Sequence, residues 1–516
     1  MAGIFALRPF EKFDLHSPLC VTGLIIKGLV ALVIAAVFIN CFSGFDFAGF
    51  FAFVRRPFTL KVIRNSFSIS FRAALYSSAV GLVLALMFSS SDFALKRVLL
   101  RIMRIPFVLP SIIIIVALTS VFGVSGMIKG ASGFLYSKGG IVLAHSYYSL
   151  PVVFFSVLSA LGQRKFDMEE SFMTLGASRF LSFVLITFPS ILKTLALSFM
   201  LSFISAFSSF TIVVTFGGMK TSNIESEIYK SFSIGDAGAY SGFCLLSLMF
   251  SLVFAACSMR IQRTQRTEGR SMAVRPMRRA SMPTRLMLDA VAALASAVVM
   301  VPLLTVFFSA FMRGGSFSFA NFSSMLRFFG TILKSMAFSG FISVISVAIV
   351  VLLAAYARRT GDANVGILFA GALSSMLLSS SLARFPGLSL SVAHVFMTVP
   401  FSYYLVKGEY DVMRQSMLES ARLVTGNEFL CVFYVELSNL RHVVANASVF
   451  SFALSFCDVS STLLLSRGRF YTASMLLHQA VSHYDFNMAC AIAVVMAVAV
   501  MLFYAIVRFV LSKSYG

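Results

Sequence analysis

The residues that could carry out chemistry are few, and they form no catalytic or metal-binding motif. The six histidines contain no H-E-x-x-H pair, and the seven cysteines contain no CxxC pair. No G-x-x-x-x-G-K-[ST] loop is available to hold a nucleotide phosphate. We therefore expect no catalytic residue, no metal ligand and no ATP hydrolysis in this chain. The cysteines are expected to act as small buried apolar side chains.

One segment has a spacing that predicts a defined local shape. The chain reads Glu-Ser-Phe-Met-Thr-Leu-Gly-Ala from Glu170 to Ala177, and Phe-Pro follows at 188–189. A carboxylate at Glu170 suits the positive end of a helix dipole, and Gly176 can adopt the left-handed conformation that ends a helix. The pattern predicts a short helix, a turn at Gly176 and a second helix that returns at Pro189.

Four more residues are candidates for lining a polar pathway: His145, Ser209, His394 and Asp458. Ionisable groups are costly to place in apolar segments, so they are candidates for function where they occur. For the two histidines we prefer the competing interpretation, a hydrogen bond that packs helices together or a position near water at the end of a span. For Asp458 a role in a pathway or in pairing, and a role in packing, both stay open.

The surroundings of these residues are defined by an unusual composition. The chain has 516 residues, of which 59% are hydrophobic and 12% are charged. A soluble chain is about 25% charged, so a soluble enzyme, a secreted disulfide scaffold and a disordered chain are excluded. About twelve continuously apolar stretches approach the roughly 20 residues that cross a bilayer, which predicts an all-α polytopic membrane protein rather than a barrel. They lie near 19–41, 66–90, 105–123, 140–161, 191–216, 238–258, 287–312, 331–356, 365–383, 388–406, 446–465 and 488–510.

The charges are strongly basic, with 42 Lys and Arg against 20 Asp and Glu. Eight arginines lie between Arg260 and Arg285 without an interleaved aromatic residue, so we expect a cytoplasmic linker near anionic lipids and no nucleic-acid partner. The bias of basic residues toward one side predicts that both termini face the cytoplasm. The basic residues at 55–64 fall on the opposite side and do not fit this rule.

The second half of the chain repeats the first at a constant offset of 249 residues. Ala144-His145 recurs as Ala393-His394, and the same offset relates the pairs Met168 and Met417, Glu170 and Glu419, Ser171 and Ser420, Phe207 and Phe456, and Asp236 and Asp485. The spans of each copy occur in the same order and orientation. We therefore expect two parallel, pseudo-symmetric halves with a pathway between them.

The repeat and the linker predict five regions. Residues 1–59 form an N-terminal cytoplasmic segment, the first transmembrane helix and an external loop. Residues 60–260 form the first of the two repeated membrane domains, and residues 261–286 form the basic linker. Residues 287–329 form the seventh transmembrane helix and an external loop, and residues 330–516 form the second repeated membrane domain.

The segment from Glu170 to Pro189 resembles the EAA loop of permease subunits of bacterial ABC importers. In the second copy Thr425 stands at the glycine position, Gly426 follows it and Ser438 replaces the proline. The resemblance covers residues 60–260 and 330–510 and implies a type I importer fold in the bacterial inner membrane. In that family the loops form coupling helices that dock into the ATPase, which implicates Glu170, Ser171, Gly176, Ala177, Glu419, Ser420, Ala421 and Gly426.

The same resemblance implies the partners. They are two ABC ATPase subunits, which would bind the ATP and Mg, and a periplasmic or lipid-anchored solute-binding protein. The segment from Ser455 to Ser466, with Asp458 inside it, resembles thiamine permeases, as does Tyr434-Val-Glu436. We favour thiamine or its phosphates as the substrate, with iron(III) as the alternative. A secondary transporter is less favoured because inverted repeats would be expected, and a membrane-embedded enzyme is favoured least.

Overall fold

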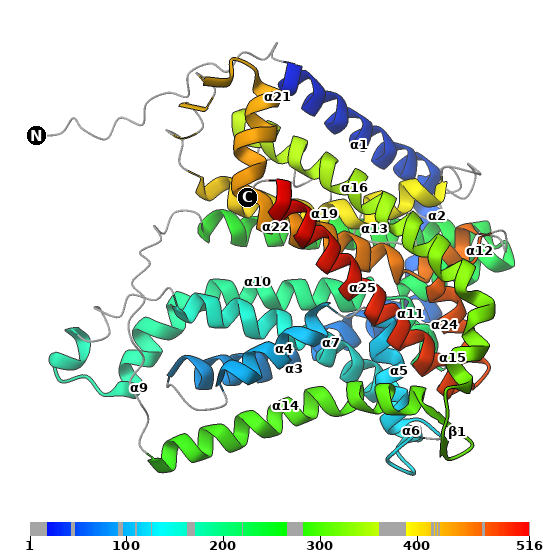
Figure 1. Ribbon diagram of the computed structural model, residues 1–516. Coiled ribbons are helices and arrows are strands. Elements are labelled where there is room, and N and C mark those ends of the chain that lie inside the picture. Colours follow the sequence, from blue (N-terminus) through cyan, green and yellow to red (C-terminus); the bar gives the residue numbers. More distant parts are fainter. Residues whose placement is uncertain are drawn as a thin grey trace, which may run out of the picture.

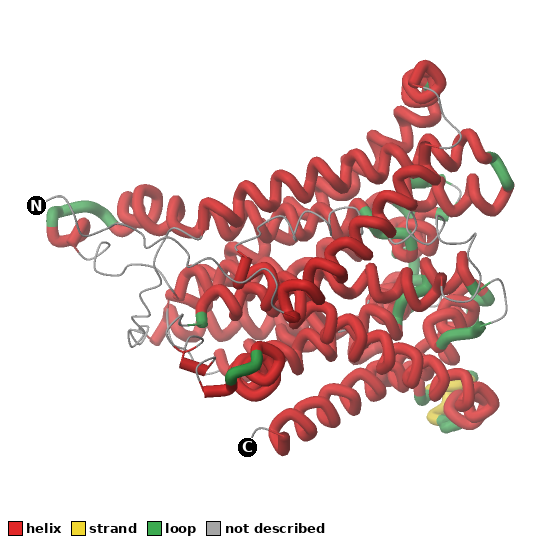
Figure 2. The backbone as a smooth tube through the Cα atoms, turned by 90° about the horizontal axis from the view of Figure 1, so that it is seen from above, coloured by secondary structure: helices red, strands yellow, loops and turns green. Residues whose placement is uncertain are grey.

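A computed structural model describes residues 18–42, 47–90, 96–108, 111–124, 126–162, 171–218, 220–265, 282–360, 389–413, 417, 420–421, 424–466 and 470–514. The described part is almost entirely helical, and one two-stranded hairpin is the exception (Figure 2). The hairpin turns at Gly314 and Gly315, which both have positive φ, the requirement of a tight two-residue hairpin turn.

The first half contains α1 Pro18–Phe42, α2 Phe47–Arg55, α3 Pro57–Ser90, α4 Lys96–Val108, α5 Ser111–Phe122, α6 Ser132–Leu135, α7 Lys138–Gly162, α9 Arg179–Ser182, the π-helix η1 Phe183–Thr187, α10 Phe188–Phe207, α11 Thr211–Gly217, α12 Ile224–Ile234 and α13 Ala237–Gln265. The second half contains α14 Met282–Ala310, β1 Met312–Arg313, β2 Ser316–Phe317, α15 Ala320–Met325, the 3-10 helix η2 Leu326–Phe328, α16 Phe329–Thr360, α19 Ser389–Val412, α21 Glu428–Leu430, the π-helix η4 Cys431–Glu436, α22 Leu437–Phe456, α23 Ser460–Leu465, α24 Ala473–Ser482 and α25 Phe486–Ser514.

Within the described residues, nine helical segments are long and apolar enough to cross a membrane. They correspond to nine of the twelve predicted spans. The predicted span at 365–383 lies outside the described residues, as does most of the basic linker. The remaining two predicted spans, 105–123 and 446–465, are not among the nine.

The predicted span at 105–123 is divided between two described helices, α4 and α5, with residues 109–110 outside the described part, and neither helix is among the nine. The α4 helix carries Lys96, Arg97, Arg101 and Arg104 and is amphipathic. The α5 helix is almost wholly buried in the protein. Its 12 residues rise about 18 Å, which is too short for a hydrocarbon core of about 30 Å.

The predicted spans at 191–216 and 446–465 are each interrupted by a break in the helix. In the first half α10 ends at Phe207 and α11 starts at Thr211. In the second half α22 ends at Phe456 and α23 starts at Ser460. Counting apolar residues could not locate these breaks, because the apolar stretch continues beyond each one, at Ile212–Val214 in the first half and Leu463–Leu465 in the second.

The helix boundaries recur at the offset found in the sequence. The α10 and α22 helices start and end 249 residues apart, and so do the first residues of α11 and α23, of α12 and α24, and of α13 and α25. The last pair has matching caps, since the carboxylates of Asp236 and Asp485 accept hydrogen bonds from the backbone N–H groups of Ala239 and Met488. The two copies therefore share their local architecture as well as their residues.

The helices run between two ends of an elongated bundle. In Figure 1, α9, α21, the start of α1 and the end of α25 lie toward the left, while α12, α24, α15 and the hairpin lie toward the right. The α1 helix packs against α16 of the second half, and α14 packs against α4 and α5 of the first. The Tyr147 hydroxyl of α7 donates a hydrogen bond to the Val299 carbonyl of α14. Each half thus contributes one long helix, α1 or α14, that packs against the other half.

The contact between α1 and α16 gives a test with a matched control on the same helix. A Cβ added at Gly23 would lie 2.5 Å from the Tyr356 Cβ, whereas one added at Gly28 would meet nothing within 4 Å. We expect Gly23→Ala to destabilise the protein by about 1–3 kcal/mol through overpacking. We expect Gly28→Ala to be neutral or stabilising, because alanine favours a helix. Thermal unfolding in detergent measures both, and equal effects would contradict this description of the contact.

Candidate coupling loops and polar network

The first loop, residues 171–182, has the shape predicted from its sequence. Residues 171–174 are helical, and Gly176 has a φ of 92°, so the prediction of a left-handed glycine is confirmed. The Gly176 N–H donates to the Met173 carbonyl at 3.0 Å, and the Ala177 N–H donates to the Phe172 carbonyl at 3.2 Å. These two bonds form a Schellman motif, which satisfies the last carbonyls of the short helix.

The second loop, residues 420–430, makes a similar turn by different means. The residue with positive φ is Gly426, at 60°, one position later than in the first loop. The Thr425 hydroxyl donates to the Ala421 carbonyl at 2.8 Å, and the Asn427 side chain caps α21 by accepting from the Phe429 N–H. Glu170 and Glu419 lie outside the described residues.

Each loop presents one strongly exposed apolar residue at the same place in the repeat. Leu175 is 83% exposed and Val424 is 87% exposed, and the two are 249 residues apart. Each stands just before the turn, with Phe180 or Phe429 exposed just after it. Exposed apolar side chains on a rigid turn are typical of a surface that is covered by a partner.

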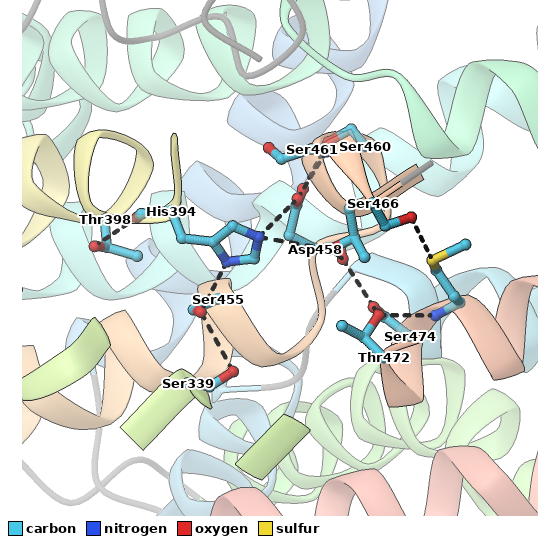
Figure 3. A network of polar contacts seen from close by, with 12 residues as sticks. Ser339, His394, Thr398, Ser455, Asp458, Ser460, Ser461, Ser466, Thr472 and Ser474 are labelled. Carbon is cyan, nitrogen blue, oxygen red and sulfur yellow. Dashed lines mark hydrogen bonds and ion pairs between the residues drawn. The ribbon is translucent and has the colours of Figure 1, made fainter. Parts of the chain in front are cut away.

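A buried polar network surrounds the break between α22 and α23 (Figure 3). The Nδ1 atom of His394 lies 2.8 Å from the Ser455 hydroxyl, and its Nε2 atom lies 3.7 Å from a carboxylate oxygen of Asp458. The Ser455 hydroxyl also donates to Ser339 of α16 at 3.3 Å. The network joins α16, α19 and α22, so His394 makes the helix-packing hydrogen bond that we preferred for it.

The Asp458 carboxylate also fixes the start of α23. It accepts hydrogen bonds from the Ser460 hydroxyl at 2.6 Å and from the Ser461 N–H at 2.8 Å. The Asp458 carbonyl accepts from the Ser474 hydroxyl of α24 at 2.8 Å. This carboxylate therefore has partners for both oxygens, which offsets the cost of burying it.

In the first half Ser209 occupies the position equivalent to Asp458, and the backbone is held in the same way. The Ser209 carbonyl accepts a hydrogen bond at 2.7 Å from the side chain of Asn223, the residue that caps α12. The first N–H groups of α12 and α24 are bonded alike: Ile224 donates to Ser66 of α3, and Ala473 donates to Ser335 of α16, both at 3.0 Å. Ser66 and Ser335 are therefore equivalent, at an offset of 269 residues.

The side chain of His145, by contrast, lacks equivalents of the residues that contact His394. Ala206 stands at the position of Ser455, and Val213 stands at the position of Thr462, which lies 3.5 Å from the His394 ring. His145 is fully buried, and neither ring nitrogen has a hydrogen-bond partner in the part of the chain that the structure describes. The four pathway candidates thus separate into two neighbours, His394 and Asp458, whose side chains approach to 3.7 Å in one polar network, and two residues that share no such network among the described residues.

Two features of the site were not recognised in the sequence. Ser66 and Ser335 belong to helices whose serines are too numerous for two of them to stand out. A buried ion pair joins Arg359 and Glu436, and the Arg359 side chain belongs to a helix 77 residues earlier in the chain. The described residues contain no group of three or more metal-ligating side chains.

Residues 77–265 match the family described as "Binding-protein-dependent transport system inner membrane component". This matched segment belongs to that family of permeases, whose members are multi-pass inner-membrane transport subunits and not enzymes. Dependence on a binding protein implies two kinds of partner, a separate ATPase and a solute-binding protein.

Named relatives differ in how much of the chain they match. The thiamine transport system permease protein ThiP of Brucella suis is 23% identical over 488 residues, 88% of this chain and 88% of the relative. ThiP of Haemophilus influenzae is 27% identical over 247 residues, 44% of this chain and only 46% of the relative. The sulfate transport system permease protein CysT of Escherichia coli is 25% identical over 202 residues, 38% of this chain and 73% of the relative.

The cap that Asp458 forms at the start of α23 can be tested, with the equivalent residue of the first half, Ser209, as the control. We expect Asp458→Ala to destabilise the protein by about 1–3 kcal/mol, because it removes the cap of α23 and leaves buried donors without an acceptor. We expect Ser209→Ala to cost less than about 0.5 kcal/mol, because Ser209 bonds Asn223 through its carbonyl, which alanine retains. Thermal unfolding in detergent compares the two variants. Equal losses would mean that the Asp458 side chain does not hold the break.

Proposed function

We propose that this chain is the membrane-spanning subunit of an ATP-driven importer that moves thiamine or its phosphates from a periplasmic binding protein to the cytoplasm. The observation that carries the importer assignment is the pair of loops. Two equivalent segments each place an exposed apolar residue before a left-handed glycine, toward one end of the bundle (Figure 1). We call these two exposed residues, Leu175 and Val424, the knobs of the loops. Two ATPase subunits would need two such docking points, one on each loop.

The mechanism follows from rigid-body movement. ATP binding closes the two ATPases, and their movement is transmitted through the loops to the helices that follow each loop. The two halves then shift relative to each other, so that the path between them opens to one side of the membrane at a time. In this mechanism the loops and both chain termini face the cytoplasm, and no bond in the substrate is made or broken.

The roles of individual residues follow the same proposal. Ser171, Gly176, Ala177, Ser420, Ala421 and Gly426, together with Glu170 and Glu419, shape the two docking surfaces. The domains at 60–260 and 330–516 each supply one loop and one side of the pathway. The pathway residues are those near the two breaks: Ser209 and His145 in the first half, and Asp458 and His394 in the second.

Thiamine is favoured because two of the relatives named as thiamine permeases match 88% and 80% of the chain, which includes both halves. Relatives named as sulfate permeases match less than two fifths of it. Iron(III) remains the alternative from the sequence of the second half. A secondary transporter is less consistent with the parallel repeat and the binding-protein-dependent family.

Reconstitution tests the function directly. The chain is placed in proteoliposomes with its cognate ATPase and binding protein, and uptake of radiolabelled thiamine is compared with uptake of sulfate and iron(III). We expect ATP-dependent uptake of thiamine alone. Uptake that persists without ATP and collapses with the ion gradient would overturn the importer assignment, whereas ATP-driven uptake of another solute would overturn only the substrate.

The docking surfaces are tested by charge placed on each knob. We expect Leu175→Asp and Val424→Asp each to weaken ATPase binding by roughly tenfold or more, because loss of a central apolar contact costs about 2 kcal/mol. Ile234→Asp is the control, since Ile234 is 72% exposed on α12, toward the opposite end of the bundle. Binding is measured by surface plasmon resonance with the permease in nanodiscs. Unchanged affinity in both loop variants would contradict the assignment.

A further inference from the structure

A buried cluster of charged and polar groups lies just after the second loop. The guanidinium of Arg359 lies 2.6 Å from Oε1 of Glu436, and the Tyr410 hydroxyl donates to Oε2 of Glu436 at 2.8 Å. Arg359 is 3% exposed, and Glu436 and Tyr410 are not exposed at all. The Cys431 thiol also lies 3.7 Å from Oε1 of Glu436. Both carboxylate oxygens are therefore bonded.

The cluster joins three helices near the loop. Glu436 is the last residue of η4, ten residues after Gly426, on the helical run that leaves the second loop. Arg359 lies in the last turn of α16, and Tyr410 lies near the end of α19. The Glu436 carboxylate thus ties the helix that carries the loop to the ends of two other helices.

Hydrogen bonds between side chains join the same three helices further along their length. The Ser346 and Thr398 hydroxyls are 2.7 Å apart between α16 and α19, and the Ser402 and Ser451 hydroxyls are 2.7 Å apart between α19 and α22. The Ser343 hydroxyl donates to the carbonyl of residue 448 at 2.7 Å. These helices are therefore joined at several levels, from the ion pair to the network at the break.

The first half has none of the residues that form the ion pair. At the offset of 249 residues, Thr187 stands at the position of Glu436 and Leu161 at that of Tyr410. At the offset of 269 residues that relates α3 to α16, Ser90 stands at the position of Arg359. The serines equivalent to Ser346 and Ser451 donate within their own helices, Ser77 to the Ala74 carbonyl and Ser202 to the Ser198 carbonyl. Two side-chain hydrogen bonds do join α3 and α7, from Lys138 to Asn65 and from Ser146 to the Ala73 carbonyl, but they lie in the first parts of these helices, away from the ends that correspond to the ion pair. The equivalent π-helix, η1, is present, so the difference lies in the side chains.

We propose that the Arg359–Glu436–Tyr410 cluster is a clamp that makes the second loop, α16, α19 and α22 move as one rigid body, whereas the first loop moves relative to its own helices. This inference rests on the proposed coupling function. Glu436 and Arg359 are positioning residues: they contact neither substrate nor nucleotide and act by holding the loop-bearing helix. The two loops therefore transmit ATPase closure unequally.

Spin labels measure this movement in equivalent places of the two halves. One pair of labels replaces Tyr434 on η4 and Val344 on α16, and the matched pair replaces Leu185 and Leu75 at the equivalent positions of the first half. All four side chains are exposed in the structure. Distances are measured in the complex with its ATPase, without nucleotide and trapped with ATP and vanadate. We expect the 434–344 distance to change by less than about 2 Å and the 185–75 distance to change by more.

The clamp itself is removed by paired substitutions. Arg359→Met or Glu436→Met alone leaves a buried charge without its partner and lowers the thermal unfolding temperature, whereas Arg359→Met with Glu436→Met leaves no such charge and restores much of it. We expect the double variant to show a 434–344 distance that now changes on trapping. We also expect thiamine uptake per ATP hydrolysed to fall roughly tenfold, within the range usual for coupling between distant sites. Leu161→Met, at the first-half position equivalent to Tyr410, is a volume-conserving control and should leave both readouts unchanged.

The outcomes separate the clamp from the proposed function. If the double variant keeps the wild-type distances, or if the 434–344 pair already moves in the wild type, the clamp does not exist as proposed. If unfolding temperature is the only property that changes, the ion pair serves stability alone, which also overturns the inference. If instead the wild-type complex shows neither ATP-driven distance changes nor uptake, the coupling function fails first.

Discussion

The structure depends on one constraint: a backbone polar group that leaves the helical pattern inside an apolar bundle must find a partner within the protein. Both long helices that follow the loops break, and each break frees such groups. The Ser209 and Asp458 carbonyls are satisfied from α12 and α24, and the first N–H groups of those helices are satisfied by Ser66 and Ser335. The break, the short helix after it and a distant long helix thus form one bonded unit. This unit occurs twice because the second half of the sequence repeats the first.

The two copies share this backbone arrangement and differ in what their side chains add. In the second half a histidine, an aspartate and several hydroxyls bond across helices, whereas in the first half Ala206 and Val213 leave His145 without a partner among the described residues. The first half has fewer such bonds among its described residues, with Lys138 to Asn65 and Ser146 to the Ala73 carbonyl between α7 and α3, and it packs Phe67 against Phe203, Phe207, Phe250 and Phe254 at centroid distances of 4.9–6.1 Å. Hydrogen bonds constrain direction as well as distance, whereas apolar contacts are non-directional. The halves are therefore related in fold but differ in the interactions that hold their helices together.

The sequence predicted what depends on apolar length and on residue spacing. Nine spans and the left-handed turn at Gly176 were available from the sequence, because each depends on residues that are close together in the chain, whereas the position of the second turn at Gly426 was found only in the structure. The breaks at 208–210 and 457–459 were missed, since their stability comes from Asn223, Ser474 and serines on α3 and α16. The division of 105–123 was missed because an amphipathic helix and a short buried helix add up to one apolar stretch. The ion pair between Arg359 and Glu436 was missed for the same reason as the caps: its partners meet only after folding.

The energetics of that ion pair favour a positional role over a stabilising one. Removing two charges from water costs several kcal/mol each, so a buried pair adds little net stability compared with apolar residues of the same size. Hydrogen bonds between helices in membrane proteins contribute about 0.6 kcal/mol each on average, which is also modest. Both kinds of interaction nevertheless favour one geometry strongly, because any displacement leaves a buried charge or donor unpaired. A half that is joined by such bonds from the loop to the break resists internal rearrangement, and movement imposed at its loop can only be passed on to the other half.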